Sequence, residues 1–399
     1  MSYTSNLRTS NYELLRIVCI LTIILGHFVG QSGFYSFSSL KDCAYFSFGT
    51  SLSRVSCSVF MIISSWFLVE QNFKISRAIK TACALVFYTA VITIYGIWSS
   101  KFGTEVNLFM ALHPLEESPL WFASYYVIFV MMTPFLNVIL KDKRLLEYYL
   151  FFYFIFSPLY STLTCRQGFF NNSIWVFMSI YLFVGYIKKY RPVFIPNNIF
   201  LPVMIFAGTY IGLNVIRSFS IYFYINKIFL GSSGEFFGYV RAYSDFYNAT
   251  LETLPNLIMA FSLFCVFLNI NIGSNKIINM LSSTTLGVYC FHQVPTWYEF
   301  LWENIYKAKI LKSSFSDSEK LFYTIFVVIS VYFIASIIEI IRSYIFESII
   351  FKSKLYKTCC NNFDALLYNR ENCINYQFII CSIIFCVIYN VFTIFFVYI

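Results

Sequence analysis

The sequence predicts an all-α fold: a polytopic transmembrane helical bundle in which ten spans form the core and one further span follows at the C-terminus. Three observations support this prediction. Of the 399 residues, 59% are hydrophobic and only 12% are charged, whereas about a quarter of the residues in a soluble domain are charged. The mean hydropathy is +0.68. Since a spanning helix needs about 20 apolar residues, the composition suffices for about ten or eleven spans.

The apolar segments give the expected spans in order. They cover about residues 12–30, 48–69, 79–99, 119–140, 148–164, 173–187, 199–216, 252–270, 284–301, 321–342 and 376–399. We therefore expect residues 1–345 to form the membrane core, residues 346–375 to form a cytoplasmic linker, and residues 376–399 to form an additional transmembrane helix.

The connecting segments alternate in charge, which predicts the orientation. Basic residues gather in the segments expected inside, among them Arg8, Lys74, Arg77, Lys80, Lys141, Lys143, Arg144, Lys188, Lys189, Arg191 and Arg370. Acidic residues gather in the segments expected outside, among them Glu105, Glu116, Glu117, Glu235, Asp245, Glu299 and Glu303. Because Lys and Arg are enriched in cytoplasmic loops, we expect the N-terminus in the cytoplasm. An odd number of spans then places the C-terminus outside.

The first span carries the most informative polar residues. Arg16 and His27 are eleven residues apart, close to three helical turns, so both side chains should share one face at about 16 Å along the axis. Glu13 lies three residues before Arg16 and within pairing reach. Ionisable groups inside a span are costly and are functional candidates by default. The alternative is an interfacial ion pair with a hydrogen-bonded core histidine.

Other spans add candidates of the same kind. Arg54 lies near the outer end of the second span, where it is either functional or reaching toward the interface. Arg77 and Lys80 share a helical face and suit an anionic ligand, although ordinary positive-inside charge explains them as well. Trp121 opens the fourth span, and His292 lies in an apolar stretch of the ninth.

Taken together, these segments resemble the bacterial membrane acyltransferase-three family, integral-membrane O-acyltransferases that modify envelope polysaccharides. The first span fits the family's R/K-x10-H pattern with Arg16 and His27. The other matches, in order within residues 10–345, are Arg54, Val59, Phe60 and residues 64–68, then Trp121, Phe122, Tyr126 and Pro134, and finally Leu286, Gly287, Tyr289 and His292. The family's R-x-x-R motif is present only as Arg77-x-x-Lys80, and Lys does not replace a bidentate Arg. The family core has ten spans, so the last span here is additional.

The resemblance implies acetyl transfer from cytosolic acetyl-CoA to a sugar hydroxyl of a surface polysaccharide or its lipid-linked precursor, in the bacterial cytoplasmic membrane. A sugar hydroxyl needs a positioned base, so His27 is expected to act as base or as transient acyl carrier. Arg16, with Glu13 beside it, is expected to stabilise charge on the thioester or to orient the donor. The expected binding residues are Lys74, Arg77 and Lys80 for the CoA phosphates, and Arg54, Trp121, Tyr289 and His292 for the acceptor. The expected partners are acyl-CoA, a carbohydrate acceptor and membrane lipid; no metal and no nucleic acid is expected.

Other functions remain open at this stage. A flippase or polymerase of lipid-linked repeat units is one alternative, and a non-catalytic membrane sensor on the same fold is another. A transporter would show paired, broken-helix halves, and the hydropathy shows no such repeat. A polymerase would carry a large Arg-rich outer loop, but the longest expected outer segment, residues 217–251, holds only Arg217, Lys227 and Arg241 as basic residues. The net charge of +9 does not indicate a nucleic-acid binder, because no soluble domain is expected to carry it. There is no C-x-x-C, G-x-S-x-G or P-loop motif.

Overall fold

The computed structural model describes residues 9–69, 71–99, 115, 120–191, 193, 195–229, 231–294 and 297–368. Within these residues, every element is a helix, so the all-α prediction is confirmed. The α-helices are α1 (Ser10–Gln31), α2 (Leu40–Leu68), α3 (Ile75–Ser99), α5 (Trp121–Ile139), α6 (Lys143–Phe154), α7 (Tyr160–Thr164), α8 (Ser173–Tyr190), α9 (Phe200–Ile225), α10 (Ser232–Ala249), α11 (Leu254–Leu268), α12 (Lys276–Ser283), α13 (Thr285–Gln293), α14 (Trp297–Phe300), α15 (Ala308–Leu311), α16 (Asp317–Phe346) and α17 (Lys354–Tyr368). The π-helical segments are η1 (Ile155–Leu159), η3 (Leu301–Ile305) and η4 (Glu347–Phe351).

Several of these helices are long and apolar enough to cross a membrane, as the sequence predicts. Among the described residues there are six such helices, α1, α2, α3, α5, α9 and α16 with η4, and the bent pair of α10 and α11 would make a seventh. The chain is therefore a multi-pass membrane protein. The predicted count of ten core spans is not confirmed.

The predicted fifth and ninth spans differ from the uninterrupted helices expected. The fifth is divided by η1, which contains Pro158. The sixth is the continuous 18-residue helix α8, with two lysines in its last turn. The ninth, predicted at 284–301, is divided between α13 and α14. The predicted eleventh span, 376–399, lies outside the described residues.

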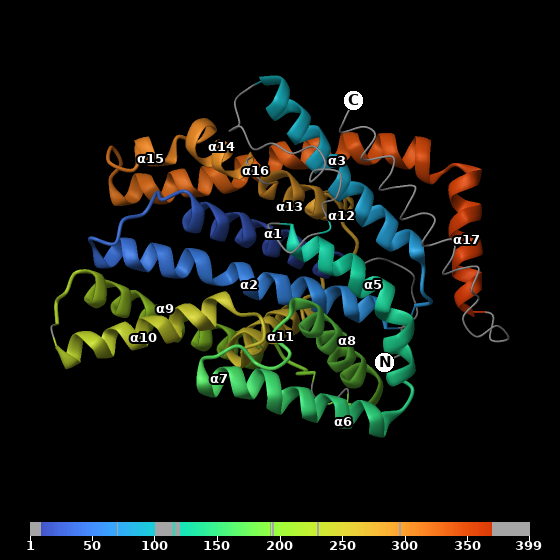
Figure 1. Ribbon diagram of the computed structural model, residues 1–399, viewed down its shortest axis with the longest axis horizontal. Helices are drawn as coiled ribbons and strands as arrows, with labels where there is room; N and C mark the ends of the chain where they lie inside the picture. The colour runs from blue at the N-terminus through green and yellow to red at the C-terminus, as the bar shows by residue number, and fades with distance from the viewer. Residues whose placement is uncertain are drawn as a thin grey trace.

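Helix α1 lies at the centre of the bundle. Figure 1 shows α1 beside α2, with α13 and α16 on one side of this pair and α9 to α11 on the other. The α1–α2 contact is close because small residues face the partner helix. A Cβ atom added to Gly26 would lie 2.6 Å from Cβ of Ser53, and one added to Gly49 would lie 3.0 Å from the Val29 side chain. Such close approach is how helices associate within membranes.

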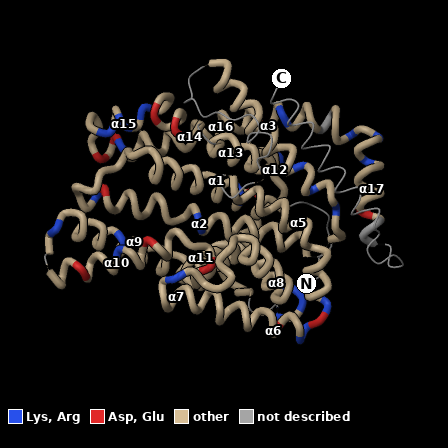
Figure 2. The backbone as a smooth tube through the Cα atoms, viewed as in Figure 1, with Lys and Arg blue, Asp and Glu red and all other residues tan. Residues whose placement is uncertain are grey.

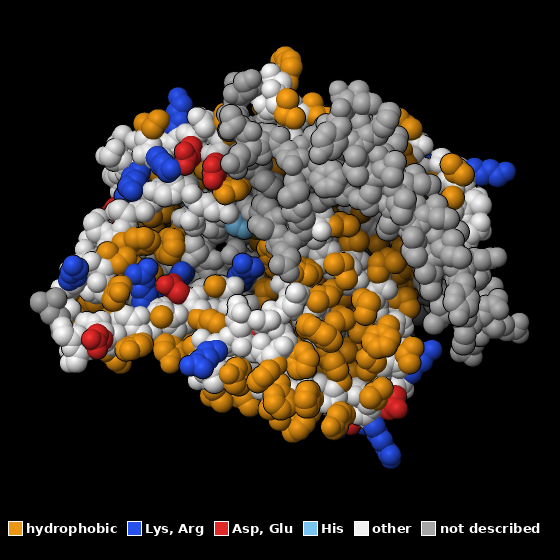
Figure 3. All heavy atoms as spheres, in the orientation of Figure 1, with side chains coloured by type: hydrophobic (Ala, Val, Ile, Leu, Met, Phe, Trp, Pro, Cys, Tyr) orange, Lys and Arg blue, Asp and Glu red, His pale blue; other side chains and the backbone are white. Residues whose placement is uncertain are grey.

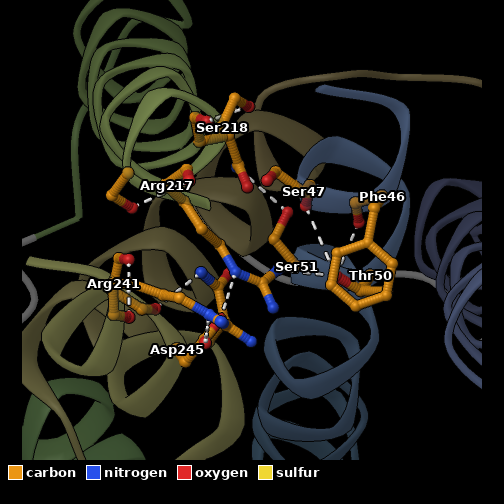
Figure 4. A network of polar contacts seen from close by, with 12 residues as sticks. Phe46, Ser47, Thr50, Ser51, Arg217, Ser218, Arg241 and Asp245 are labelled. Carbon is orange, nitrogen blue, oxygen red and sulfur yellow. Dashed lines mark hydrogen bonds and ion pairs between the residues drawn. The ribbon is translucent and has the colours of Figure 1, made fainter. Parts of the chain in front are cut away.

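The predicted outer segment 217–251 is a helical hairpin rather than a loop. Helix α9 continues to Ile225, and α10 follows from Ser232. Figure 4 shows the polar contacts that join the hairpin to α2. Nε of buried Arg217 donates to Asp245 on α10 at 2.8 Å, and its Nη1 donates to Thr50 on α2 at 2.6 Å. Pairing within the bundle thus accommodates the charge of Arg217.

Most of the charged residues lie toward the ends of the long helices (Figure 2). The predicted linker, 346–375, begins with η4 and α17. Oδ1 of Asp364 on α17 accepts a hydrogen bond from the backbone N–H of Ile75 at 2.8 Å, which caps α3 and fixes α17 against it. The predicted inner residues Arg8 and Arg370, and the predicted outer residues Glu105, Glu116 and Glu117, lie outside the described residues.

Candidate active site

One face of α1 carries Arg16, Ile20, Ile23 and His27 at helical spacing. The helix is continuous from Ser10 to Gln31, so these residues form a single stripe along it. The predicted common face of Arg16 and His27 is therefore present. The stripe runs from the Ser10 end of α1 toward the Gln31 end.

A cavity of about 280 Å³ follows this stripe from Arg16 to Ile23. Its walls come from α1, α2, α3, α5, α12 and α13. The polar lining residues are Arg16, Ser64, Thr81, Tyr126, Ser282, Ser283, Thr285 and Tyr289. Its size is near the lower end of small-molecule sites. We call it the Arg16 cavity.

Glu13 holds Arg16 in place at this cavity. Nη1 of Arg16 lies 3.0 Å from each carboxylate oxygen of Glu13, and the Ser282 hydroxyl donates to the same carboxylate. Glu13 is buried, whereas the Arg16 side chain is 23% exposed and lines the cavity. Glu13 therefore acts through Arg16, and Arg16 is the group that a ligand would meet.

His27 contacts a second histidine that comes from α13. Nδ1 of His27 lies 3.0 Å from Nε2 of His292, and Nδ1 of His292 lies 2.6 Å from the carbonyl oxygen of Val288. A carbonyl only accepts, so His292 carries its hydrogen on Nδ1. In the neutral state of both rings, Nε2 of His292 then accepts from Nδ1–H of His27. Because Nδ1 of His27 carries the hydrogen, Nε2 of His27 has the free lone pair.

His292, which the sequence predicts to bind the acceptor, lies against His27 in the structure. Its side chain is completely buried, and it contacts His27, the Val288 carbonyl and the Tyr289 ring. His27 is partly exposed. Figure 3 shows a histidine side chain within a hollow of one face of the molecule.

A second, polar cavity of about 300 Å³ lies beside Arg54 and Trp121. The Arg54 guanidinium lies 4.9 Å from the centroid of the Trp121 ring, and the other lining residues are Tyr125, Asn171, Asn172 and Ser173. Gly26, the residue before His27, packs directly against Ser53, the residue before Arg54. We call this second cavity the Arg54 cavity.

Tyr289 joins the two regions through α5. It lines the Arg16 cavity, its hydroxyl accepts from the backbone N–H of Phe122 at 3.3 Å, and its ring lies edge-on to His292. Trp121, the neighbour of Phe122, lines the Arg54 cavity. His27 itself lines neither cavity, but Ile23, about one turn before it on α1, lines the Arg16 cavity.

The predicted cofactor-binding residues Lys74, Arg77 and Lys80 have separate surroundings in the structure. Arg77 donates to the backbone carbonyl of Asn72 at 3.2 Å and to the Gln71 side chain. Lys80 lies 5.0 Å from the ring of Phe351 on η4, and Lys74 is exposed. None of the three lines the Arg16 cavity, so their role in binding CoA stays a prediction.

The sequence reasoning missed Glu339 on α16. Its carboxylate accepts two hydrogen bonds from Arg342 at 2.6 Å each and one from the Tyr88 hydroxyl at 2.8 Å. It also fills the space where a Cβ atom of Gly287 would lie, so it packs directly on α13. The sequence could have indicated Glu339, because an acidic residue interrupts the otherwise apolar span 321–342.

The model of a family described as "Acyltransferase domain" matches residues 10–340. No curated protein and no solved structure matches the chain.

Proposed function

The chain belongs to the acyltransferase-three family, and from this premise we propose that it is an O-acetyltransferase of the bacterial cytoplasmic membrane. We propose acetyl-CoA as the donor and a sugar hydroxyl of a surface polysaccharide, or of its lipid-linked precursor, as the acceptor. The contact of His27 with His292 carries the proposal, because it leaves a lone pair on a partly exposed histidine.

The donor is assigned to the Arg16 cavity. The basic residues of the inner segments favour a cytoplasmic position for the Ser10 end of α1, which would open this cavity toward cytosolic acetyl-CoA. Arg16 would then meet the thioester arm, and Lys74, Arg77 and Lys80 would contact the CoA phosphates outside the cavity. The guanidinium of Arg16 favours negative charge as it develops on the thioester oxygen.

The acceptor is assigned to the Arg54 cavity. Its aromatic, amide and hydroxyl side chains suit a sugar ring, which presents both apolar faces and hydroxyl groups. Arg54 and Trp121 line it, and Ser53, the residue before Arg54, packs against Gly26, the residue before His27. In this proposal the acceptor hydroxyl would reach His27 from the Arg54 cavity, and the thioester would reach it from the Arg16 cavity.

The proposed step transfers the acetyl group directly from the thioester to the sugar oxygen. Nε2 of His27 takes the hydroxyl proton as the sugar oxygen forms a bond to the thioester carbonyl carbon. The tetrahedral intermediate collapses, the C–S bond breaks, and the thiolate of CoA leaves and takes the proton from Nε2. The products are the O-acetyl sugar and free CoA. His292 holds the His27 ring and stabilises the positive charge that His27 gains.

The experiment is the acetyl-ester content of the host's surface glycan, measured by proton NMR. Three strains are compared: wild type, gene deletion, and deletion complemented with His27→Ala at equal protein level. We expect the acetyl signal to be lost in both altered strains while glycan length stays unchanged. An unchanged acetyl signal with shortened glycan would favour a flippase or polymerase instead.

A rapid-quench experiment separates the two roles considered for His27. Purified protein is mixed with labelled acetyl-CoA in the absence of acceptor. If His27 is a base in direct transfer, no label becomes covalently bound to protein. If His27 is an acyl carrier, its Nε2 attacks the thioester and label accumulates on the wild type and not on His27→Ala.

A further inference from the structure

A third cavity, about 570 Å³ in volume, lies between α6 with η1, α8, α9 and α11. It is bounded chiefly by apolar side chains, including Leu150, Phe154, Ile180, Phe183, Leu257 and Phe261. Two of the polar residues that line it are engaged with groups of the protein. Ser179 bonds the Tyr149 hydroxyl at 2.8 Å, and Tyr186 donates to Glu147 at 2.9 Å.

The position of this cavity indicates the chemistry of its occupant. It lies against α9 and α11, which belong to candidate membrane spans, and it offers a ligand few polar partners. Water needs two to four polar partners to occupy a buried site. A hydrocarbon chain needs none, so a chain from the membrane suits this cavity best.

One anchored segment joins the apolar cavity to the Arg54 cavity. The Phe170 ring packs against Tyr153, which lines the apolar cavity, and the next three residues, 171–173, line the Arg54 cavity. The segment is fixed by buried Glu252, whose carboxylate accepts from the backbone N–H of Gly168 and from Ser161, both at 2.8 Å. The two cavities therefore adjoin through consecutive residues of a segment held in place.

We infer that the apolar cavity binds the hydrocarbon chain of the lipid that carries the acceptor sugar. The chain lies between α8 and α11, and the sugar it carries lies beside residues 171–173 in the Arg54 cavity. The acceptor is then a membrane-anchored glycolipid rather than a soluble sugar or a finished polymer. This inference rests on the proposed function, because it takes the Arg54 cavity as the acceptor site.

The inference is tested by photocrosslinking the full chain in nanodiscs. The probe is a long-chain alkyl glucoside with a diazirine in its chain, and the comparator is a phosphatidylglycerol with a diazirine at the same depth. Labelled residues are mapped by mass spectrometry. We expect the glucoside to label the stretch 257–262 and non-photoreactive alkyl glucoside to compete at least tenfold better than phosphatidylglycerol.

A pair of matched variants tests whether the cavity itself is responsible. Ile258→Trp adds bulk at the cavity wall, and Ile211→Trp makes the same change on α9 at an exposed position that does not line this cavity. We expect Ile258→Trp to reduce labelling several-fold and Ile211→Trp to leave it unchanged.

Three outcomes would overturn the inference: no labelling at 257–262, equal labelling and competition by phosphatidylglycerol, or equal labelling of the two variants. The second would mean that bulk lipid fills the cavity. These readouts do not depend on acetyl transfer. Selective labelling without transfer would therefore contradict the proposed function alone, and transfer without selective labelling would contradict this inference alone.

Discussion

His27 and His292 lie 265 residues apart in the sequence, yet their ring nitrogens Nδ1 and Nε2 are 3.0 Å apart. The first comes from α1 and the second from α13. The Val288 carbonyl fixes the tautomer of His292, and His292 in turn fixes that of His27. The proton acceptor of the proposed reaction is thus determined by a backbone carbonyl two groups away.

Replacing His292 tests this chain of hydrogen bonds. We expect His292→Ala to lower kcat by about 10- to 100-fold, part of the 10²–10⁴ that a general base contributes, with little change in KM for acetyl-CoA. His292→Gln should retain more activity, because its Oε1 can accept from Nδ1–H of His27. Steady-state kinetics on purified protein provides the measurement. Equal activity of the Ala and Gln variants would show that the hydrogen bond to His27 is not needed.

The pair of Glu13 and Arg16 allows stability and activity to be separated. Removing one partner of a buried pair costs about 3–5 kcal/mol, whereas removing both costs much less. Because Arg16 is partly exposed, the lower end of that range applies. We expect Arg16→Met to lower the thermal unfolding midpoint in detergent and Glu13→Gln/Arg16→Met to recover much of the loss.

The same double variant should remain inactive, since Arg16 is the member of the pair that lines the cavity. Acetyl transfer and unfolding are measured on one preparation. Recovery of activity together with stability would show that the pair is only structural.

Gly287 is expected to tolerate no side chain. A Cβ atom there would overlap the Glu339 carboxylate, displace it from Arg342 and Tyr88, and disturb buried charge, so Gly287→Ala should destabilise the protein by several kcal/mol. Gly212→Ala on α9 is the matched control, because nothing lies within 4 Å of its added Cβ. That change should be neutral or stabilise by up to about 1 kcal/mol. Thermal unfolding compares the two, and similar midpoints would contradict the packing described here.

Replacing Arg54 should change the KM for the acceptor but not the KM for the donor. If the Arg54 cavity binds the acceptor, Arg54→Ala should raise the acceptor KM by about tenfold, the effect of roughly 1.4 kcal/mol, and leave the acetyl-CoA KM unchanged. Lys227→Ala is a suitable control, since it removes a basic residue at an exposed position between α9 and α10. A raised KM for acetyl-CoA with Arg54→Ala would reassign the cavity to the donor.

The sequence predicted the membrane class and the α1 stripe because both depend on local pattern. Hydropathy reports burial in lipid, and the spacing of Arg16 and His27 follows from helical geometry alone. The contact of His27 with His292 depends on how α13 packs, which no local pattern encodes. The same limit applies to 217–251. Its polarity suggested a loop, and the helical hairpin could not be predicted because the partners of Arg217 lie on α2 and α10.

The long separation of His27 from His292 sets the order in which the protein matures. During synthesis α1 is made 265 residues before its histidine partner, and Ser282, which donates to Glu13, is also late. The nascent first helix therefore holds Glu13, Arg16 and His27 without these partners until α12 and α13 have been made. A ribosome-bound chain that stops before α12 has α1 and the Arg54 cavity residues but no assembled histidine pair. Competence for acyl transfer is thus a late step of biogenesis.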